Sequence, residues 1–239
     1  VYLTEAGRTL RQYADTVLSQ FRESVEVLRE SGARGFCSFG VHVTLGETRL
    51  AGILTRLAAE LPEMQVRACV QNSRETERMI LQNELDFAVV DNVTVSPHYL
   101  VEPLREEALA AVCAPSYQTD RETLTLAELA GERLLLRERG SGTRNSVDGG
   151  FQAAGIPVRP VQESVSTGAL LACARAGIGI TLLPRPLVEA DLAAGRLREL
   201  AVADAAFRRT YFLVRHRSKY LTDGMRQVLQ VVREEIAAP

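Results

Sequence analysis

The chain has 239 residues, 46% of them hydrophobic, and 28 basic residues offset 30 acidic ones to give a formal charge of −2. This apolar content can fill the core of one large domain or of two smaller ones. Cations and anions are interspersed without a basic patch, so we expect the chain itself to bind DNA poorly.

Targeting, membrane and metal signals are absent from the sequence. No stretch approaches the ~20 consecutive apolar residues of a membrane span, and the first segment lacks the regions of a signal peptide. We therefore predict a soluble, cytoplasmic protein without membrane contact, metal or other cofactor. Four widely spaced cysteines favour buried thiols over a disulfide framework or redox pair. Because the chain starts inside an apparent element at Val1, we interpret it as truncated.

The first predicted element is a helix over residues 4–30, capped by Thr4. At ~1.5 Å per residue it would be about 40 Å long, and its apolar residues repeat at heptad spacing. Such a seam either folds back on its own domain or pairs with a partner helix. The following SGARG sequence resembles a linker and favours a dimer or tetramer. The expected seam residues are Leu10, Val17, Phe21 and Leu28.

Strands and helices then alternate, which predicts an α/β fold with parallel strands and helices on both sheet faces. In the first lobe we predict strands at 39–44, 64–70 and 86–90, with helices at 48–61 and 75–83. In the second we predict strands at 109–114, 133–137, 158–161 and 178–183, with helices at 125–129, 145–154, 168–176 and 187–193. A strand at 210–215 and a helix at 222–236, capped by Thr222, complete the chain. We expect the apolar face of this last helix to comprise Met225, Val228, Leu229, Val232 and Ile236.

Two lobes of about 100 residues suggest a hinged pair with a ligand cleft, because ligands bind beyond the carboxyl ends of parallel strands. Two turns are candidates for lining it, each leading from a strand into a helix, and their backbone amides and hydroxyls favour a small oxyanion or carboxylate. Ordinary N-capping is the alternative for the second turn and for Thr167. The candidate residues are Thr44, Leu45 and Gly46 in the first turn, Ser141, Gly142 and Thr143 in the second, and additionally Asn92 and Thr167.

Several segments, in order, resemble LysR-type transcriptional regulators. They are LTEAG at 3–7 before the long helix, GFCSFGVHVTLG at 35–46, ELDFAVVD at 84–91, LRERGSGTR at 136–144, and AGIGI at 176–180 followed by Leu183-Pro184. The resemblance covers essentially the whole chain except the family's winged helix-turn-helix, which would precede Val1.

This resemblance implies two Rossmann-like subdomains of the periplasmic-binding-protein type 2 class behind a linker and dimerisation helix at 1–32. Subdomain I would comprise 35–109 with 214–239, and subdomain II 110–213. The chain would sense a small-molecule effector and reach DNA only through the missing domain. Family members carry Ser or Thr where His42 stands. That histidine either pairs with an anion when protonated or is packed and neutral.

Two other classes of function compete with a regulator. An enzyme needs a nucleophile with its base, paired carboxylates or a metal, and the sequence GSG at 140–142 is not a GxSxG nucleophile elbow. A transporter's solute-binding protein has similar lobes, but should lack a detached dimerisation helix. Residues 4–30 therefore favour the regulator, and we predict that the chain is not an enzyme.

Overall fold

The computed structural model describes residues 3–30, 35–118 and 121–238. It divides into two compact units, Val1–Leu104 with Phe212–Pro239, and Arg105–Tyr211. The sequence placed these divisions at 109/110 and 213/214. Both observed divisions fall inside strands, β4 (Tyr99–Cys113) and β10 (Arg208–His216), which continue from one unit into the other.

Helix α1 spans Glu5–Glu30. The hydroxyl of Thr4 accepts a hydrogen bond from the Gly7 amide at 3.1 Å, which confirms the predicted cap. Large apolar side chains along α1 are exposed, including the predicted seam residues Leu10, Val17 and Phe21. The side chain of Leu28 and residues 31–34, in the predicted linker, lie outside the described part of the chain.

Unit 1 is an α/β unit with strand order β2-β1-β3-β10. Strand β1 runs parallel to β2 and β3, whereas β10 is antiparallel to β3. The elements are β1 (Phe36–His42), α2 (Val43–Thr48), α3 (Leu50–Glu60), β2 (Gln65–Gln71), α4 (Ser73–Leu81), β3 (Phe87–Val90) and α9 (Asp223–Ala237). Two predictions were wrong here: β1 ends at 42 rather than 44, and two helices replace the single helix at 48–61.

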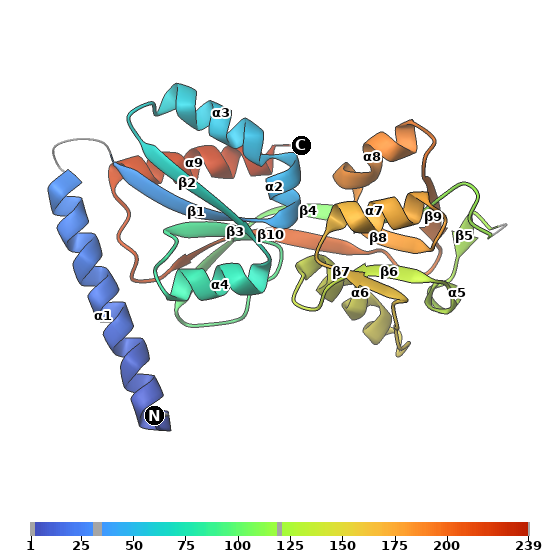
Figure 1. The fold of residues 1–239 in the computed structure, drawn as a ribbon, viewed down its shortest axis with the longest axis horizontal. Coiled ribbons are helices and arrows are strands. Elements are labelled where there is room, and N and C mark those ends of the chain that lie inside the picture. The colour runs from blue at the N-terminus through green and yellow to red at the C-terminus, as the bar shows by residue number, and fades with distance from the viewer. Residues whose placement is uncertain (1–2, 31–34, 119–120, 239) are drawn as a thin grey trace. The chain divides into compact units, whose positions relative to one another are not determined.

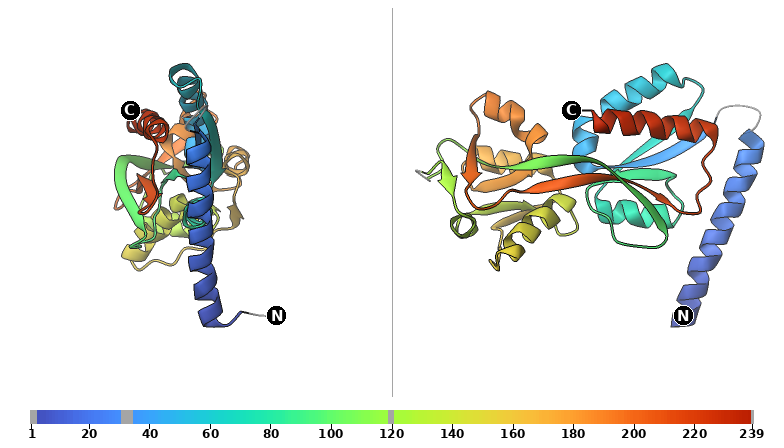
Figure 2. Two further views of the ribbon diagram at one scale, coloured as in Figure 1. Left: turned by 90° about the vertical axis from the view of Figure 1, so that its left-hand side faces the viewer. Right: turned by 180° about the vertical axis from the view of Figure 1, so that it is seen from behind.

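Helices cover both faces of the unit 1 sheet, as predicted: α3 and α9 lie on one face and α4 on the other (Figures 1 and 2). Apolar side chains alternate along β3, so that Ala88 and Val90 pack toward Met79 and Ile80 of α4. On β1 and β3, Phe39 stacks on Phe87 with ring centroids 5.5 Å apart. The predicted apolar face of α9 is buried, with Met225, Val228, Leu229, Val232 and Ile236 all in the core.

A buried ion pair lies near the amino ends of β1 and β3. The Nζ atom of Lys219, the only lysine of the sequence, lies 2.7 Å from Asp86 Oδ1. The other carboxylate oxygen of Asp86 accepts a hydrogen bond from the Ser38 amide at 2.6 Å. Lys219 Nζ also donates a hydrogen bond to Asn83 Oδ1 at 3.0 Å. Burial, together with the Asp86 carboxylate, strongly raises the pKa of the neighbouring Cys37 thiol. All four cysteines have free thiols.

Unit 2 has strand order β4-β8-β6-β7, with β9 also pairing with β4. Strand β6 is parallel to β7 and β8, but β4 is antiparallel to β8 and β9, so the sheet is mixed. The elements are β5 (Thr123–Leu124), α5 (Leu126–Gly131), β6 (Leu134–Arg137), α6 (Gly142–Ala153), β7 (Gln162–Ser164), α7 (Thr167–Arg175), β8 (Ile180–Pro184), α8 (Arg185–Ala193) and β9 (Arg198–Val202). The predicted strand at 158–161 was wrong, since β7 begins at Gln162.

Two apolar clusters pack on opposite faces of the unit 2 sheet. Along β4, Leu109 and Ala111 join the cluster under α5 and α6, whereas Ala110 and Val112 join the cluster under α7 and α8. This period-two alternation holds the two pairs of helices on opposite faces (Figure 1). The sheet thereby fixes where α6 and α7 begin, at the carboxyl ends of β6 and β7.

None of the helices in the described ranges is long and apolar enough to cross a membrane. Within the same ranges, no group of three or more His, Cys, Asp or Glu residues is placed to hold a metal ion.

Candidate functional site

The first predicted turn, in unit 1, is the junction of β1 and α2. Thr44 and Leu45 are buried, and the Thr44 hydroxyl has no hydrogen-bond partner within the described residues. Packing explains why residue 46 is a glycine, because a Cβ atom there would lie 2.6 Å from Val70 Cγ1 of β2. The glycine therefore lets α2 approach β2 closely. At this turn the Thr44 hydroxyl is a buried donor and acceptor that no described residue satisfies.

His42 is fully buried at the end of β1 and caps α2. Its Nδ1 accepts the Thr44 amide at 3.3 Å, and its Nε2 lies 3.2 Å from Asp91 Oδ2. The second Asp91 oxygen accepts from Ser73 Oγ at 2.7 Å. Because Nδ1 accepts a hydrogen bond, the geometry favours the packed, neutral imidazole with its proton on Nε2. His42 thus has a structural role: through the Thr44 amide and Asp91 it orients the start of α2.

Asn92 follows Asp91 directly after β3 and is partly buried. Asp91 was not predicted as a functional residue. The sequence signal for it was present, because an acidic residue directly after an apolar parallel strand lies at the edge where polar groups converge.

The second predicted turn, in unit 2, joins β6 to α6. Gly140 has a φ of 97°, which favours glycine, and Ser141 occupies the N-cap position of α6. Yet the Ser141 side chain makes no capping hydrogen bond, and its buried Oγ has no partner among the described residues. Helix α6 begins at Gly142, three residues earlier than predicted. The capping alternative is therefore wrong for Ser141.

Thr143 is engaged inside unit 2. Its hydroxyl accepts from Arg209 Nη1 at 2.8 Å. The Arg209 guanidinium also pairs with Glu107 at 2.6 Å and lies 4.7 Å from the ring centroid of Tyr211. This buried arginine places positive charge beside the start of α6. Sequence reasoning missed Arg209, since its partner Thr143 is distant in the chain.

The Arg144 side chain is buried, and its guanidinium binds groups of unit 2. It donates to Asp148 at 2.8 Å, to Glu163 at 2.7 Å and to the Arg137 carbonyl at 3.0 Å. Burial acts to lower the pKa of this guanidinium, but the hydrogen bonds with Asp148 and Glu163 outweigh it and raise that pKa. Through Glu163, this guanidinium ties α6 to β7.

Thr167 begins α7, but Ser166 is the residue that caps it, with Ser166 Oγ accepting the Ala169 amide at 3.2 Å. The Thr167 hydroxyl instead lies 3.4 Å from Arg137 Nη1. Arg137 is buried at the end of β6 and also pairs with Glu138 at 2.9 Å. Arg137 was missed as well, although a cation ending an apolar strand is a signal that could have identified it.

Comparison with known proteins defines the class of molecule. The LysR substrate binding domain family matches residues 30–237. The HTH-type transcriptional regulator YeiE of Escherichia coli is 30% identical over 95% of this chain and 77% of its own length. BbuR of Bordetella bronchiseptica, another such regulator, is 31% identical over 99% of this chain and 74% of its own length.

Solved structures agree on the fold. The regulatory domain of Synechocystis CcmR, in complex with 2-PG, superposes with a TM-score of 0.75 at 20% identity, covering 84% of this chain and 97% of that domain. The effector-binding domain of QuiR, in complex with shikimate, superposes with a TM-score of 0.73 at 16% identity, covering 85% of this chain and 98% of that domain. The expected periplasmic-binding-protein-like fold is confirmed.

The chain belongs to the LysR substrate binding domain family, and it is the effector-binding region of a LysR-type transcriptional regulator. The resemblance found in the sequence is confirmed. The regulators among its relatives support this interpretation and not the solute-binding protein of a transporter.

Proposed function

We propose that this region senses a small anion, an oxyanion or a carboxylate, and that Ser141 at the start of α6 is its principal contact. The observation that supports this most directly is the Ser141 hydroxyl, which is buried at an N-cap position without a partner in the described chain. A buried hydroxyl without a hydrogen bond destabilises a protein, and a ligand that supplies the missing partner removes that cost.

The chemistry around Ser141 favours a negative ligand. The first amides of α6 carry the positive end of the helix dipole, and Gly142 brings no side chain to obstruct them. Buried Arg209 and Arg137 add positive charge nearby, although Glu107 and Glu138 each pair with one of them. The effector is thus best bound by hydrogen bonds from Ser141 and the amides, which need no unpaired cation.

In unit 1 we propose Thr44 as a second contact. Its hydroxyl is also buried and has no hydrogen-bond partner among the residues that the structure describes, and His42 and Asp91 hold the adjoining backbone in place. Leu45, Gly46 and Asn92 would line the same region of unit 1, and Thr143 and Thr167 that of unit 2. The expectation that both turns face one cleft stays a prediction.

Structures with the same fold are in complex with small molecules, 2-PG for CcmR and shikimate for QuiR. By analogy, we propose that the effector shifts the equilibrium between two states of this region. It can do so only by its difference in affinity for them. The DNA-binding part of the full regulator would respond to that shift, and no catalytic step is involved.

Self-association through α1 forms part of this proposal. A helix with exposed Leu10, Val17 and Phe21 exposes apolar surface that a partner helix would cover. Leu10→Glu with Val17→Glu should dissociate a dimer or tetramer in sedimentation analysis. Asp15→Asn, on the other side of the helix, should not. An unchanged mass for the double variant would show that α1 is not the dimerisation element.

The effector proposal is tested by titrating sulfate, nitrate and short carboxylates into the chain and measuring melting temperature and heats of binding. Ser141→Ala should weaken the best ligand about tenfold, as expected for one lost hydrogen bond to a charged group. Ser146→Ala on the same helix is the matched control. Thr44→Val, paired with exposed Thr55→Val, tests unit 1. If both Ser141→Ala and Thr44→Val left binding intact, the proposed contacts would be wrong.

A further inference from the structure

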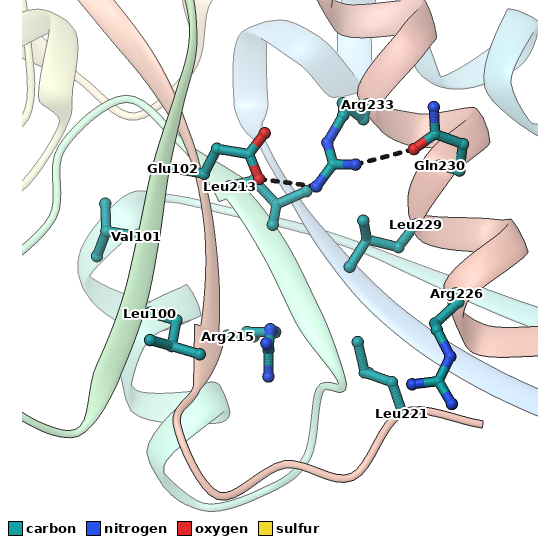
Figure 3. A pocket seen from close by; sticks show the side chains of 10 residues that line it. All are labelled: Leu100, Val101, Glu102, Leu213, Arg215, Leu221, Arg226, Leu229, Gln230 and Arg233. Carbon is teal, nitrogen blue, oxygen red and sulfur yellow. Dashed lines mark hydrogen bonds and ion pairs between the residues drawn. The ribbon is translucent and has the colours of Figure 1, made fainter. Parts of the chain in front are cut away.

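Unit 1 contains a pocket that is lined by none of the residues proposed as effector contacts. It has a volume of about 440 Å³, within the range of small-molecule sites. Strand β4, strand β10 and helix α9 form its walls (Figure 3). The lining residues are Leu100, Val101, Glu102, Leu213, Arg215, Leu221, Arg226, Leu229, Gln230 and Arg233.

The pocket has an apolar part. Leu213, Leu221 and Leu229 are buried side chains that present carbon surface to it, and Leu100 adds to this wall from β4. A fully hydrated inorganic ion would gain nothing from such a surface, because burying it there costs hydration without offering hydrogen bonds. The walls therefore favour an occupant with a hydrocarbon body.

The charged part of the pocket is positive, with three arginines against one glutamate. Arg233 binds Glu102 at 2.7 Å and Gln230 at 2.8 Å, as the dashed lines in Figure 3 show. Arg226 pairs with Asp223 at 3.2 Å, a contact that solvent screens because the Asp223 side chain is 95% exposed. Because a single glutamate faces three arginines, the lining of the pocket has an excess of positive charge.

Among the three arginines of the pocket, Arg215 is the one best placed to bind an anionic ligand. Its partly buried guanidinium has neither an ion pair nor a hydrogen bond to any described residue, and it lies beside Leu100 and Leu221 (Figure 3). The Nε of Arg233 is a further buried donor without an acceptor in the described ranges. A guanidinium presents a planar fork of donors that matches a carboxylate.

We propose that this pocket is a second ligand site, which binds a small monocarboxylate with an apolar body. Arg215 pairs with the carboxylate, and the leucines of β10 and α9 contact the hydrocarbon. The site is separate from the proposed effector contacts, since all its residues lie in unit 1 and none is Thr44 or a neighbour of it.

The test uses 4-phenylbutyrate as the probe, with 4-phenylbutanol and 4-phenylbutylamine as neutral and cationic analogues, titrated into the whole chain by calorimetry. The carboxylate should bind at least tenfold more tightly than either analogue. Arg215→Met should remove that preference, whereas Arg208→Met, an exposed arginine of the same strand outside the pocket, should not. Val101→Trp, at the exposed rim, should block the pocket with Arg215 intact.

Equal binding of the acid and the alcohol would overturn the proposal, as would unchanged affinity in Arg215→Met or no binding at millimolar concentration. Should Arg215→Met fail to fold, the Val101→Trp variant decides by itself. Thr44→Val with Ser141→Ala should leave 4-phenylbutyrate affinity unaltered. Loss of binding in that double variant would show that the probe occupies the effector contacts instead and would refute the second site.

Discussion

Two serines at equivalent positions in unit 2 should respond oppositely to the same substitution. Ser141 and Ser166 are the N-cap residues of α6 and α7. The Ser166 hydroxyl accepts the Ala169 amide at 3.2 Å, whereas the Ser141 hydroxyl is buried and, within the described residues, makes no hydrogen bond. Without ligand, Ser166→Ala should destabilise the protein and Ser141→Ala should stabilise it.

The magnitudes follow from these contacts. Losing an N-cap bond costs about 1 kcal/mol. A buried hydroxyl without a partner lowers the free energy of unfolding by about 1–3 kcal/mol. The small cavity that alanine leaves offsets part of the benefit of removing this hydroxyl, so Ser141→Ala should raise the free energy of unfolding by about 1 kcal/mol. For a chain of this size, each 1 kcal/mol moves Tm by about 2–4 °C. The two variants should therefore melt about 4–8 °C apart, on either side of the parent protein.

Adding the effector should cancel the stability advantage of Ser141→Ala over the parent protein. At 100 times Kd, a ligand stabilises the folded state by about 2.7 kcal/mol. A tenfold weaker Kd reduces this to about 1.4 kcal/mol, which cancels the gain of the alanine variant. Calorimetric melting with and without ligand measures both effects. Destabilisation of the ligand-free protein by Ser141→Ala would show that this hydroxyl has a structural partner, and the argument for it as a ligand contact would fail.

Three further predictions concern packing and charge. Gly46→Ala should cost about 1–3 kcal/mol in urea unfolding, because its Cβ would meet Val70 at 2.6 Å, and adding Val70→Ala should recover most of the loss. Lys219→Met should cost about 3–5 kcal/mol in the same assay, because Asp86 is left buried without its cation. Hydrogen bonds and charge from Arg175 and then Arg196 hold the pKa of Asp191 below its usual value, although burial opposes them. That stabilisation is present above the unfolded pKa of about 3.9 and is lost as the pH falls through the folded pKa. Asp191→Asn should therefore be less stable at neutral pH, and its deficit should shrink in acid.

Matched variants accompany the first and the third of these predictions. Gly149→Ala, where a new Cβ meets nothing within 4 Å, should stabilise α6 slightly and separates backbone effects from the clash at Gly46. Asp223→Asn removes an exposed carboxylate whose pair with Arg226 is screened by solvent, and it should cost little stability at neutral pH. A loss under 1 kcal/mol in Lys219→Met would mean that the Asp86 carboxylate is adequately solvated without its lysine.

Local signals in the sequence were sufficient for much of the fold. Thr4 and Thr222 cap their helices as predicted, because an N-cap hydroxyl bonds to an amide within the next three residues. The apolar face of α9 and the order of strands and helices followed from periodicity alone. Both turns were identified because glycine and hydroxyl residues between a strand and a helix leave a local signature.

Only the tertiary structure decided how those turns are used. The start of α2 at Val43 depends on His42, which is not among the usual capping residues and is held by Asp91 from another strand end. Strand β9 exists because it pairs with β4, far earlier in the chain. Likewise, Thr143 and Arg144 are bound by Arg209 and Glu163, whereas the Ser141 hydroxyl has no partner in the part of the chain that the structure describes. Sequence spacing encodes contacts within a few residues, but which hydroxyl is satisfied depends on donors and acceptors that folding brings from distant segments.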